Sequence, residues 1–150
     1  MIAEKRGMAL PLALLALVVI AALVAGGFAA ALLEQRIGRS ALYVVQAAGA
    51  AEAGVAAVVG AWNDHGLGPL APGDSAGLPT VRLPGRAAYS PTVSRLNSEL
   101  FLLRVAGVRN DAGGGVLARR EVGLLVRAGS GVPGGLAVQP LRDRPWVVSP

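Results

Sequence analysis

Side chains able to carry out acid–base, nucleophilic or metal chemistry are scarce in this chain. Its 150 residues include no Cys and a single His, His65. The lack of Cys excludes a disulfide framework, a thiol nucleophile and a thiolate metal site, and one His cannot form a histidine metal cluster. A zinc site would need Asp and Glu alone, which is unusual. His65 is thus the one candidate for catalysis by a histidine base.

Three features invite a catalytic interpretation, and for each we favour a structural one. The Asp64-His65 pair has no nucleophile near it and falls at a predicted helix end, where we expect a solvated cap. Gly113-Gly114-Gly115 lacks the Gly-Lys-Ser/Thr ending of a phosphate-binding loop, so we interpret it as a hairpin connection. No G-x-S-x-G context surrounds the serines Ser90, Ser94 and Ser98. We therefore predict that the protein is not an enzyme and uses no cofactor or metal.

Basic residues outnumber acidic ones, 14 to 9, which gives a formal net charge of +5. From residue 63 onward there are ten Arg and six acidic residues, a net charge of +4. A basic head of this kind can contact DNA or an anionic surface. The arginines are scattered along the sequence, however, and few aromatic residues accompany them: Trp62, Tyr89, Phe101 and Trp146. We favour a solvated sheet face and keep nucleic acid as an alternative partner.

The element that must position everything else is an uncharged run from Met8 to Leu33, 26 residues long. A membrane-spanning helix needs about 20 predominantly apolar residues. The whole chain is 53% hydrophobic and only 15% charged, which argues against a wholly soluble cytoplasmic protein because soluble domains carry about 25% charged residues. Lys5 and Arg6 precede the run, so the positive-inside rule places the N-terminus in the cytoplasm and the rest of the chain on the other side.

The helical pattern continues beyond the apolar run. Residues 34–62 contain no Pro, and apolar residues recur at steps of three and four with charged residues mainly between them, which is typical of an amphipathic helix. Together the two halves, 8–33 and 34–62, predict one helix of about 55 residues, roughly 80 Å long. Asn63 to Gly66 carry a normal stop signal.

The rest of the chain predicts a small antiparallel sheet. A Gly- and Pro-rich linker, 63–79, leads into a β-rich head, 80–150. We expect strands at 80–83, 98–108 and 116–127, the last two joined as a hairpin by the loop 109–115. Alternation places Phe101, Leu103 and Val105 on one face of the first long strand. On one face of the second it places five apolar residues: Val116, Ala118, Val122, Leu124 and Val126. Residues from Gly129 onward are expected to be irregular, apart from a last edge strand at 146–148. One apolar face of the sheet should pack on the stripe of the long helix, which makes the predicted fold class α+β.

The first residues carry the most specific signal. A short charged leader, Met1 to Arg6, ends in Gly7, and the apolar run begins at once with Met8. This arrangement resembles the class III signal peptide of type IV pilins and type II secretion pseudopilins. The resemblance implies that a prepilin peptidase cuts between Gly7 and Met8 on the cytoplasmic side, removes residues 1–7 as a leader peptide and leaves Met8 open to N-methylation.

A second stretch supports this resemblance. The segment Gln46–Val55, with Glu52 inside an Ala-Ala-Glu-Ala-Gly element, is similar to the N-terminal region of PilX-type minor pilins. The resemblance covers residues 5–62 and implies a structural subunit held in the bacterial inner membrane, with its head periplasmic or extracellular, before it enters a filament. The implied partners are other pilin or pseudopilin subunits, the prepilin peptidase, the inner-membrane assembly platform and membrane lipid.

The sequence departs from the pilin pattern at one position. Most pilins carry Glu at the fifth residue after the cut, where this chain has Leu12, preceded by Pro11. In the family that carboxylate pairs with the N-terminal ammonium of a neighbouring subunit, and the K-type minor pseudopilin at the filament tip also lacks it. Inserting a carboxylate into a bilayer costs about 2.5–3.5 kcal/mol of free energy. Such a residue is therefore kept only where pairing with a partner offsets this cost. We therefore expect a minor or tip-proximal subunit.

Two further features of the span have alternative interpretations. Gly26-Gly27 indicates either a soft point in the helix, as filament pilins often lose helicity near this depth, or close packing of helices through small residues. Ala29-Ala30-Ala31 resembles a signal-peptide cleavage site, but the apolar core is longer than the 7–15 residues of such signals. A single-pass signal anchor without processing, carrying a basic binding head, remains the alternative function.

Overall fold

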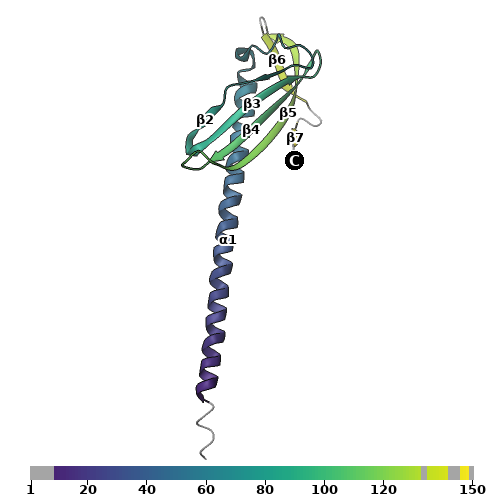
Figure 1. The fold of residues 1–150 in the computed structure, drawn as a ribbon. Helices are drawn as coiled ribbons and strands as arrows, with labels where there is room; N and C mark the ends of the chain where they lie inside the picture. The colour runs from purple at the N-terminus through teal and green to yellow at the C-terminus, as the bar shows by residue number, and fades with distance from the viewer. Residues whose placement is uncertain (1–8, 133–134, 142–145, 149–150) are drawn as a thin grey trace, which may run out of the picture. The chain divides into compact units, whose positions relative to one another are not determined.

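The computed structural model describes residues 9–132, 135–141 and 146–148 (Figure 1). The chain divides into two compact units, Met1–Arg39 and Ser40–Pro150, which are described one by one. Gly7 and Met8, the predicted processing site, lie outside the described residues. Cleavage between them stays a prediction.

The first unit is helical throughout its described part. It contains the first 31 residues of α1, a helix that runs from Ala9 to Gly60 without a break. Its Leu- and Ala-rich sequence favours a helix, and Pro11 lies in the first turn, where a missing N–H costs nothing. The helix continues through Gly26 and Gly27. The predicted long helix is therefore confirmed.

The second unit combines the last 21 residues of α1 with one antiparallel sheet, which confirms the predicted α+β class. After α1 a short 3-10 helix, η1 (Trp62–His65), ends at Gly66, whose φ of 61° is left-handed. Seven strands follow: β1 (Ser75–Gly77), β2 (Val81–Leu83), β3 (Ala87–Arg95), β4 (Leu100–Asn110), β5 (Val116–Val132), β6 (Gly135–Pro140) and β7 (Trp146–Val148). A second 3-10 turn, η2 (Pro84–Arg86), joins β2 to β3.

The centre of the sheet is a meander in the order β3-β4-β5, with shorter strands on both edges. β1 and β2 pair with successive parts of β3, and β7 and β6 pair with successive parts of β5. The predicted β4–β5 hairpin is confirmed, with Arg109 paired to Ala118 and a tighter connection than expected. The predicted strands at 80–83 and 146–148 are present as β2 and β7.

Three strands were missed by sequence reasoning. The expectation of an irregular tail from Gly129 is wrong, because β5 extends to Val132 and β6 follows; β1 lies in the predicted linker. β3 was hidden by Pro91, since proline argues against a strand interior. In the structure the carbonyl oxygen of Pro91 accepts from the N–H of Leu78 at 2.9 Å. N and C=O of one residue face the same neighbour in an antiparallel strand, so the missing N–H faces away from β4 and costs no bond there.

The core lies between α1 and one face of the sheet. The sheet contributes Phe101, Leu103 and Val105 from β4 and Leu124 and Val126 from β5, all at most 3% exposed. These are residues that alternation had placed on one face, so that part of the pattern is confirmed. Val116 was expected on the same face but is 62% exposed, because it begins β5 at the hairpin end. The ring of Trp62 packs edge-on against Phe101, 5.4 Å between centroids.

Candidate anchoring and assembly surfaces

The first unit presents an apolar helical surface with nothing covering it. Every described side chain from Ala9 to Leu42 is exposed, and Leu10, Leu12 and Leu23 are each about 70% exposed. The helix is long and apolar enough to cross a membrane. Exposed apolar patches beyond a few hundred Å² mark membrane or protein contacts. The surface therefore requires lipid or other helices around it.

The residues singled out in the span lie on this surface. Leu12 and Pro11 are exposed in the first turns, and Gly26 and Gly27 lie in regular helix. A Cβ atom built on either glycine meets nothing within 4 Å, so no contact with the described residues requires glycine there. Both interpretations of the pair, a soft point and close packing with another helix, therefore place its role outside the single chain.

The small residues of the segment Gln46–Val55 form a seam against the sheet. Ala47, Ala50, Ala51 and Gly54 are buried on the face of α1 that contacts the sheet. A Cβ on Gly54 would lie 2.7 Å from Cγ1 of Val105 and closer still to the ring of Tyr89. A Cβ on Gly107 of β4 would lie 2.1 Å from the backbone oxygen of Ala47. Helix and sheet thus approach so closely that only small residues fit.

Glu52 lies on the opposite side of α1 from this seam. It is exposed, as are Gly49, Ala53 and Ala56 around it, and it has no hydrogen bond or ion pair within the described part of the chain. The Ala-Ala-Glu-Ala-Gly element therefore has two faces. Ala50, Ala51 and Gly54 pack on the protein's own sheet, while Ala53 and the carboxylate of Glu52 face outward.

Arg109 ties the helix to the end of β4, a role that sequence reasoning missed. Its Nε donates to Oε1 of Gln46 at 2.7 Å, and its guanidinium carbon lies 5.7 Å from the centroid of the Tyr43 ring. It also donates to the carbonyl oxygen of Asn110. The sequence placed Arg109 in a loop. The contact with Gln46 could be inferred only from the placement of Arg109 opposite that polar helix residue. This placement follows from the strand register, which the sequence does not provide.

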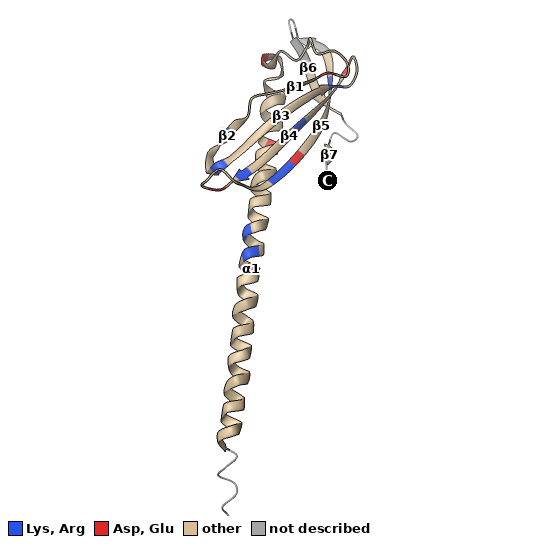
Figure 2. Ribbon diagram, viewed as in Figure 1, with Lys and Arg blue, Asp and Glu red and all other residues tan. Residues whose placement is uncertain are grey.

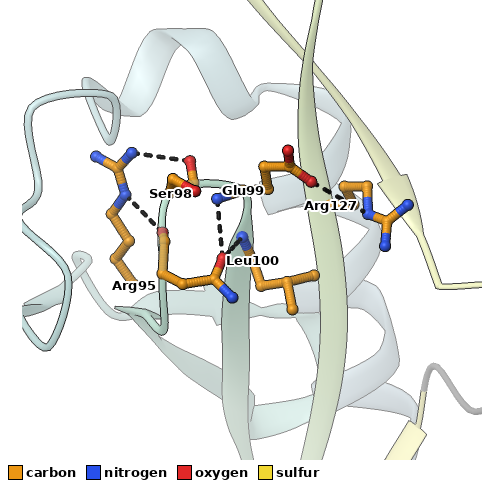
Figure 3. Close-up of polar contacts among 6 residues, drawn as sticks. Arg95, Ser98, Glu99, Leu100 and Arg127 are labelled. Carbon is orange, nitrogen blue, oxygen red and sulfur yellow. Dashed lines mark hydrogen bonds and ion pairs between the residues drawn. The ribbon is translucent and has the colours of Figure 1, made fainter.

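A second arginine, Arg95, organises the β3–β4 turn (Figure 3). Its guanidinium donates to the carbonyl oxygens of Gly68, Leu70, Asn97 and Ser98 at 2.6–3.2 Å. The same group lies 5.3 Å from the centroid of the Phe101 ring. Arg95 therefore joins the Gly- and Pro-rich segment before β1 to the turn after β3.

The same turn is closed by Asn97, whose Oδ1 accepts from the N–H groups of Glu99 and Leu100 at 2.8–2.9 Å (Figure 3). Glu99 in turn lies 3.8 Å from Nε of Arg127 on β5. The side chains of Arg95 and Asn97 are hydrogen-bonded to backbone groups of this turn. We therefore assign the turn a structural role.

The residues considered for catalysis are not brought together. Asp64 and His65 lie in η1, while Ser90 and Ser94 on β3 pair through their hydroxyls with Thr80, just before β2, and with Ser75 on β1, at 2.8 and 2.7 Å. These strands line an open hollow of about 310 Å³ on the sheet face away from the helix, with Arg104, Arg119 and Glu121 at its other side. Glu121 is the one carboxylate among its lining residues, and within the described chain it is paired with Arg119 at 4.0 Å and has no hydrogen bond to a serine. Among the described residues, no three His, Asp or Glu side chains are grouped to hold a metal ion.

Gly113 to Gly115 form the β4–β5 connection. The carboxylate of Asp111 accepts from the N–H groups of Gly113 and Gly115, both at 2.8 Å, and Gly114 has a φ of 88°. The amides that a phosphate loop would offer to a ligand are thus used by the turn itself. The structural interpretation of this segment is the one that its geometry supports.

Comparison with known protein families, with characterised proteins and with solved structures finds no significant match to this chain. Function must therefore be argued from the residues and the fold.

Proposed function

We propose that this chain is a structural minor subunit of a type IV pilin-like filament, either a type IV pilus or a type II secretion pseudopilus. The observation that carries the proposal is the junction at Gly7-Met8. A charged leader ends in glycine directly before an uncharged run, and from Ala9 onward that run belongs to one unbroken helix whose last turns pack in the core of a β-sheet head.

The apolar surface of α1 serves two stages in this proposal. Before assembly it holds the subunit in the inner membrane, with the N-terminus cytoplasmic and the head on the periplasmic side. In the filament the same surface packs against the helices of other subunits, so that burial in protein replaces burial in lipid. The prepilin peptidase and the assembly platform act on the chain, which has no catalytic role of its own.

Leu12 supports a minor or tip-proximal position. A subunit without a carboxylate at this point cannot pair with the N-terminal ammonium of a subunit ahead of it. The described part of the first unit supplies no substitute, because its first acidic residue is Glu34. The subunit can therefore be followed by others while having none ahead.

The test is the intact mass and N-terminal sequence of the membrane-extracted protein, produced with and without a prepilin peptidase. We expect a mature chain that starts at methylated Met8 only when the peptidase is present. The variant Gly7→Val should remain uncut, while the matched leader variant Ala3→Val should be processed normally.

Two other results would contradict the filament proposal. A chain that still starts at Met1 in the presence of the peptidase is a plain signal anchor with a basic head. A chain that starts near Leu32 is a secreted protein cut after Ala29-Ala30-Ala31, and the anchoring function would fall with it.

A further inference from the structure

The arginines that are scattered in the sequence gather at one end of the sheet. β2 ends, β3 begins, β4 ends and β5 begins at this end, as the pairs Leu83–Ala87, Ala87–Arg109 and Val108–Arg119 show. We call it the arginine end. It carries five of the eight arginines described in the head: Arg82, Arg86, Arg109, Arg119 and Arg120. Figure 2 shows blue segments gathered at this end of the strands.

Acidic residues do not neutralise this end. The carboxylate of Asp111 is used by the amides of its own turn, and Glu121 lies 4.0 Å from Arg119 alone. Arg82, Arg86 and Arg120 are exposed and have no hydrogen bond or ion pair within the described residues. Positive charge is therefore free at the arginine end.

The opposite end of the sheet has a different balance. There Arg95 ends β3, Asp74 directly precedes β1, and Glu99 in the β3–β4 turn lies beside Arg127 of β5. Arg95 is fully used by carbonyl oxygens, and Arg127 is 3.8 Å from Glu99. Among the residues that the structure describes, unpaired arginines are therefore more numerous at the arginine end than at the opposite end.

Exposed apolar side chains accompany the arginines. Val116 and Leu117 begin β5 and are 62% and 43% exposed, next to Arg119 and Arg120. Arginines that surround exposed aliphatic side chains suit a lipid interface, where guanidinium groups bind phosphates and apolar groups enter the headgroup boundary.

The arginine end is also the end of the head at which α1 begins its contacts with the sheet. Arg109 bonds to Gln46 and lies over Tyr43. Only ten positions separate Tyr43 from Leu33, the last residue of the apolar run, and Arg36 and Arg39 lie among them. A chain whose apolar run is in a bilayer therefore has a short connection to this end.

We propose that the arginine end docks the head onto the anionic phospholipid headgroups of the bilayer in which α1 is anchored. This inference rests on the membrane-anchoring part of the proposed function and not on filament assembly. Nucleic acid offers the same phosphates, but its backbone would leave Val116 and Leu117 without an apolar partner. Those two side chains and the short connection to the apolar run favour lipid.

The experiment uses the full chain in nanodiscs, where the absence of Cys allows single-site labelling. A fluorophore is attached at Leu117→Cys, at the arginine end, or at Leu96→Cys, which is 48% exposed at the opposite end. Quenching by a headgroup-linked quencher is compared between phosphatidylcholine discs and discs that contain phosphatidylglycerol. We expect strong quenching at position 117 only in anionic discs, weakened by 1 M salt, and little at position 96 in either.

The arginine dependence is tested with Arg86→Gln, Arg119→Gln and Arg120→Gln combined. Arg109 is left intact because it holds the helix. We expect the docking equilibrium to fall roughly fivefold for each arginine removed, whereas the matched variants Arg104→Gln and Arg127→Gln leave it unchanged. Equal quenching in neutral and anionic discs, or no effect of the triple variant, would overturn the proposal.

Two further measurements distinguish lipid docking from a failure of membrane anchoring and from binding of nucleic acid. Incorporation of the chain into discs is measured first by gel filtration, so that failure of anchoring is distinguished from failure of docking. A fluorescent DNA duplex is then added to the neutral discs. Binding of DNA that requires the same three arginines, without any lipid-dependent quenching, would overturn the lipid assignment and give this surface to nucleic acid.

Discussion

Gly107 is the residue at which the helix and the sheet of the head come closest. A Cβ there would lie 2.1 Å from the backbone oxygen of Ala47 and 2.5 Å from the backbone nitrogen of Ala51. Backbone cannot rotate aside as a flexible side chain can, so Gly107→Ala must push α1 off β4. Overpacking usually costs about 1–3 kcal/mol, and we expect a loss at or above the upper end of that range.

Denaturant unfolding of the full chain in detergent, followed by the fluorescence of buried Trp62, measures this loss. The matched control is Gly77→Ala on β1, where a Cβ meets nothing within 4 Å. Equal stability of the Gly107 and Gly77 variants would show that helix and sheet are not in close contact.

Arg95 makes a different kind of contribution, because its fork of donors spans four carbonyl oxygens. Lysine keeps the charge but has a single nitrogen that cannot reach all of them. We expect Arg95→Lys to lower the free energy of unfolding by about 1–3 kcal/mol, the range for hydrogen bonds to charged groups.

The control for this variant is Arg104→Lys, an exposed arginine of β4 without a hydrogen bond in the described chain, for which we expect a change within about 0.5 kcal/mol. Thermal unfolding of both variants in the same detergent compares them. An Arg95→Lys protein as stable as the parent would mean that the four carbonyl contacts contribute nothing.

At the scale of elements, periodicity and length located α1 and the β4–β5 hairpin. Phe101, Leu103 and Val105 alternate cleanly, and the helix has no proline after its first turn. The strands β3 and β6 were not predicted from the sequence, and the reason is physical. Pro91 and the Gly- and Pro-rich tail oppose strand formation locally, and only pairing with β4 and β5 compensates for this, which the pattern of a single segment cannot reveal.

Leu12 allows the proposed position of the subunit to be tested on the helix itself. If the missing carboxylate restricts the chain to the tip, Leu12→Glu should let it pair with a subunit ahead and become distributed along the filament. Leu14→Glu places the same charge two residues further on, with a similar insertion cost of about 2.5–3.5 kcal/mol but in the wrong place for pairing. We expect it to enter filaments no better than the parent.

Immunogold labelling of sheared filaments, together with the ratio of this chain to the major subunit, gives the readout. The Leu12→Glu protein should be found along the filament at a higher ratio than the parent. Unchanged incorporation and position would argue that another feature determines where this subunit sits.

At the scale of the whole molecule, the sequence predicted the helix, the sheet and their association, but not the distribution of charge. Arg82, Arg109 and Arg120 are far apart in the chain and look like a solvated face. They lie at the same end of the sheet only because β2 pairs with β3, β3 with β4 and β4 with β5, each antiparallel and in one particular register. The arginine end is thus a property of topology, and no local pattern could reveal it.

The last prediction concerns which part of the chain folds alone. α1 contributes Val55 and Val58, and η1 contributes Trp62, to the same core cluster as Phe101, Leu103 and Val105. At about 1.5–3 kcal/mol for each fully buried side chain, removing those three helix residues forfeits roughly 5–9 kcal/mol, comparable with the whole stability of a small domain. We therefore expect the fragment 40–150 to fold in water and the fragment 63–150 to fail.

Amide proton–nitrogen correlation spectra of both fragments measure this directly, without relying on tryptophan. A dispersed spectrum for 40–150 and a collapsed or aggregated one for 63–150 are the expected pair. A well-dispersed spectrum for 63–150 would mean that the sheet covers its own apolar face. In that case the head would fold independently of α1, and α1 would serve only as its anchor. The small-residue seam of α1 would then not contribute to the stability of the head.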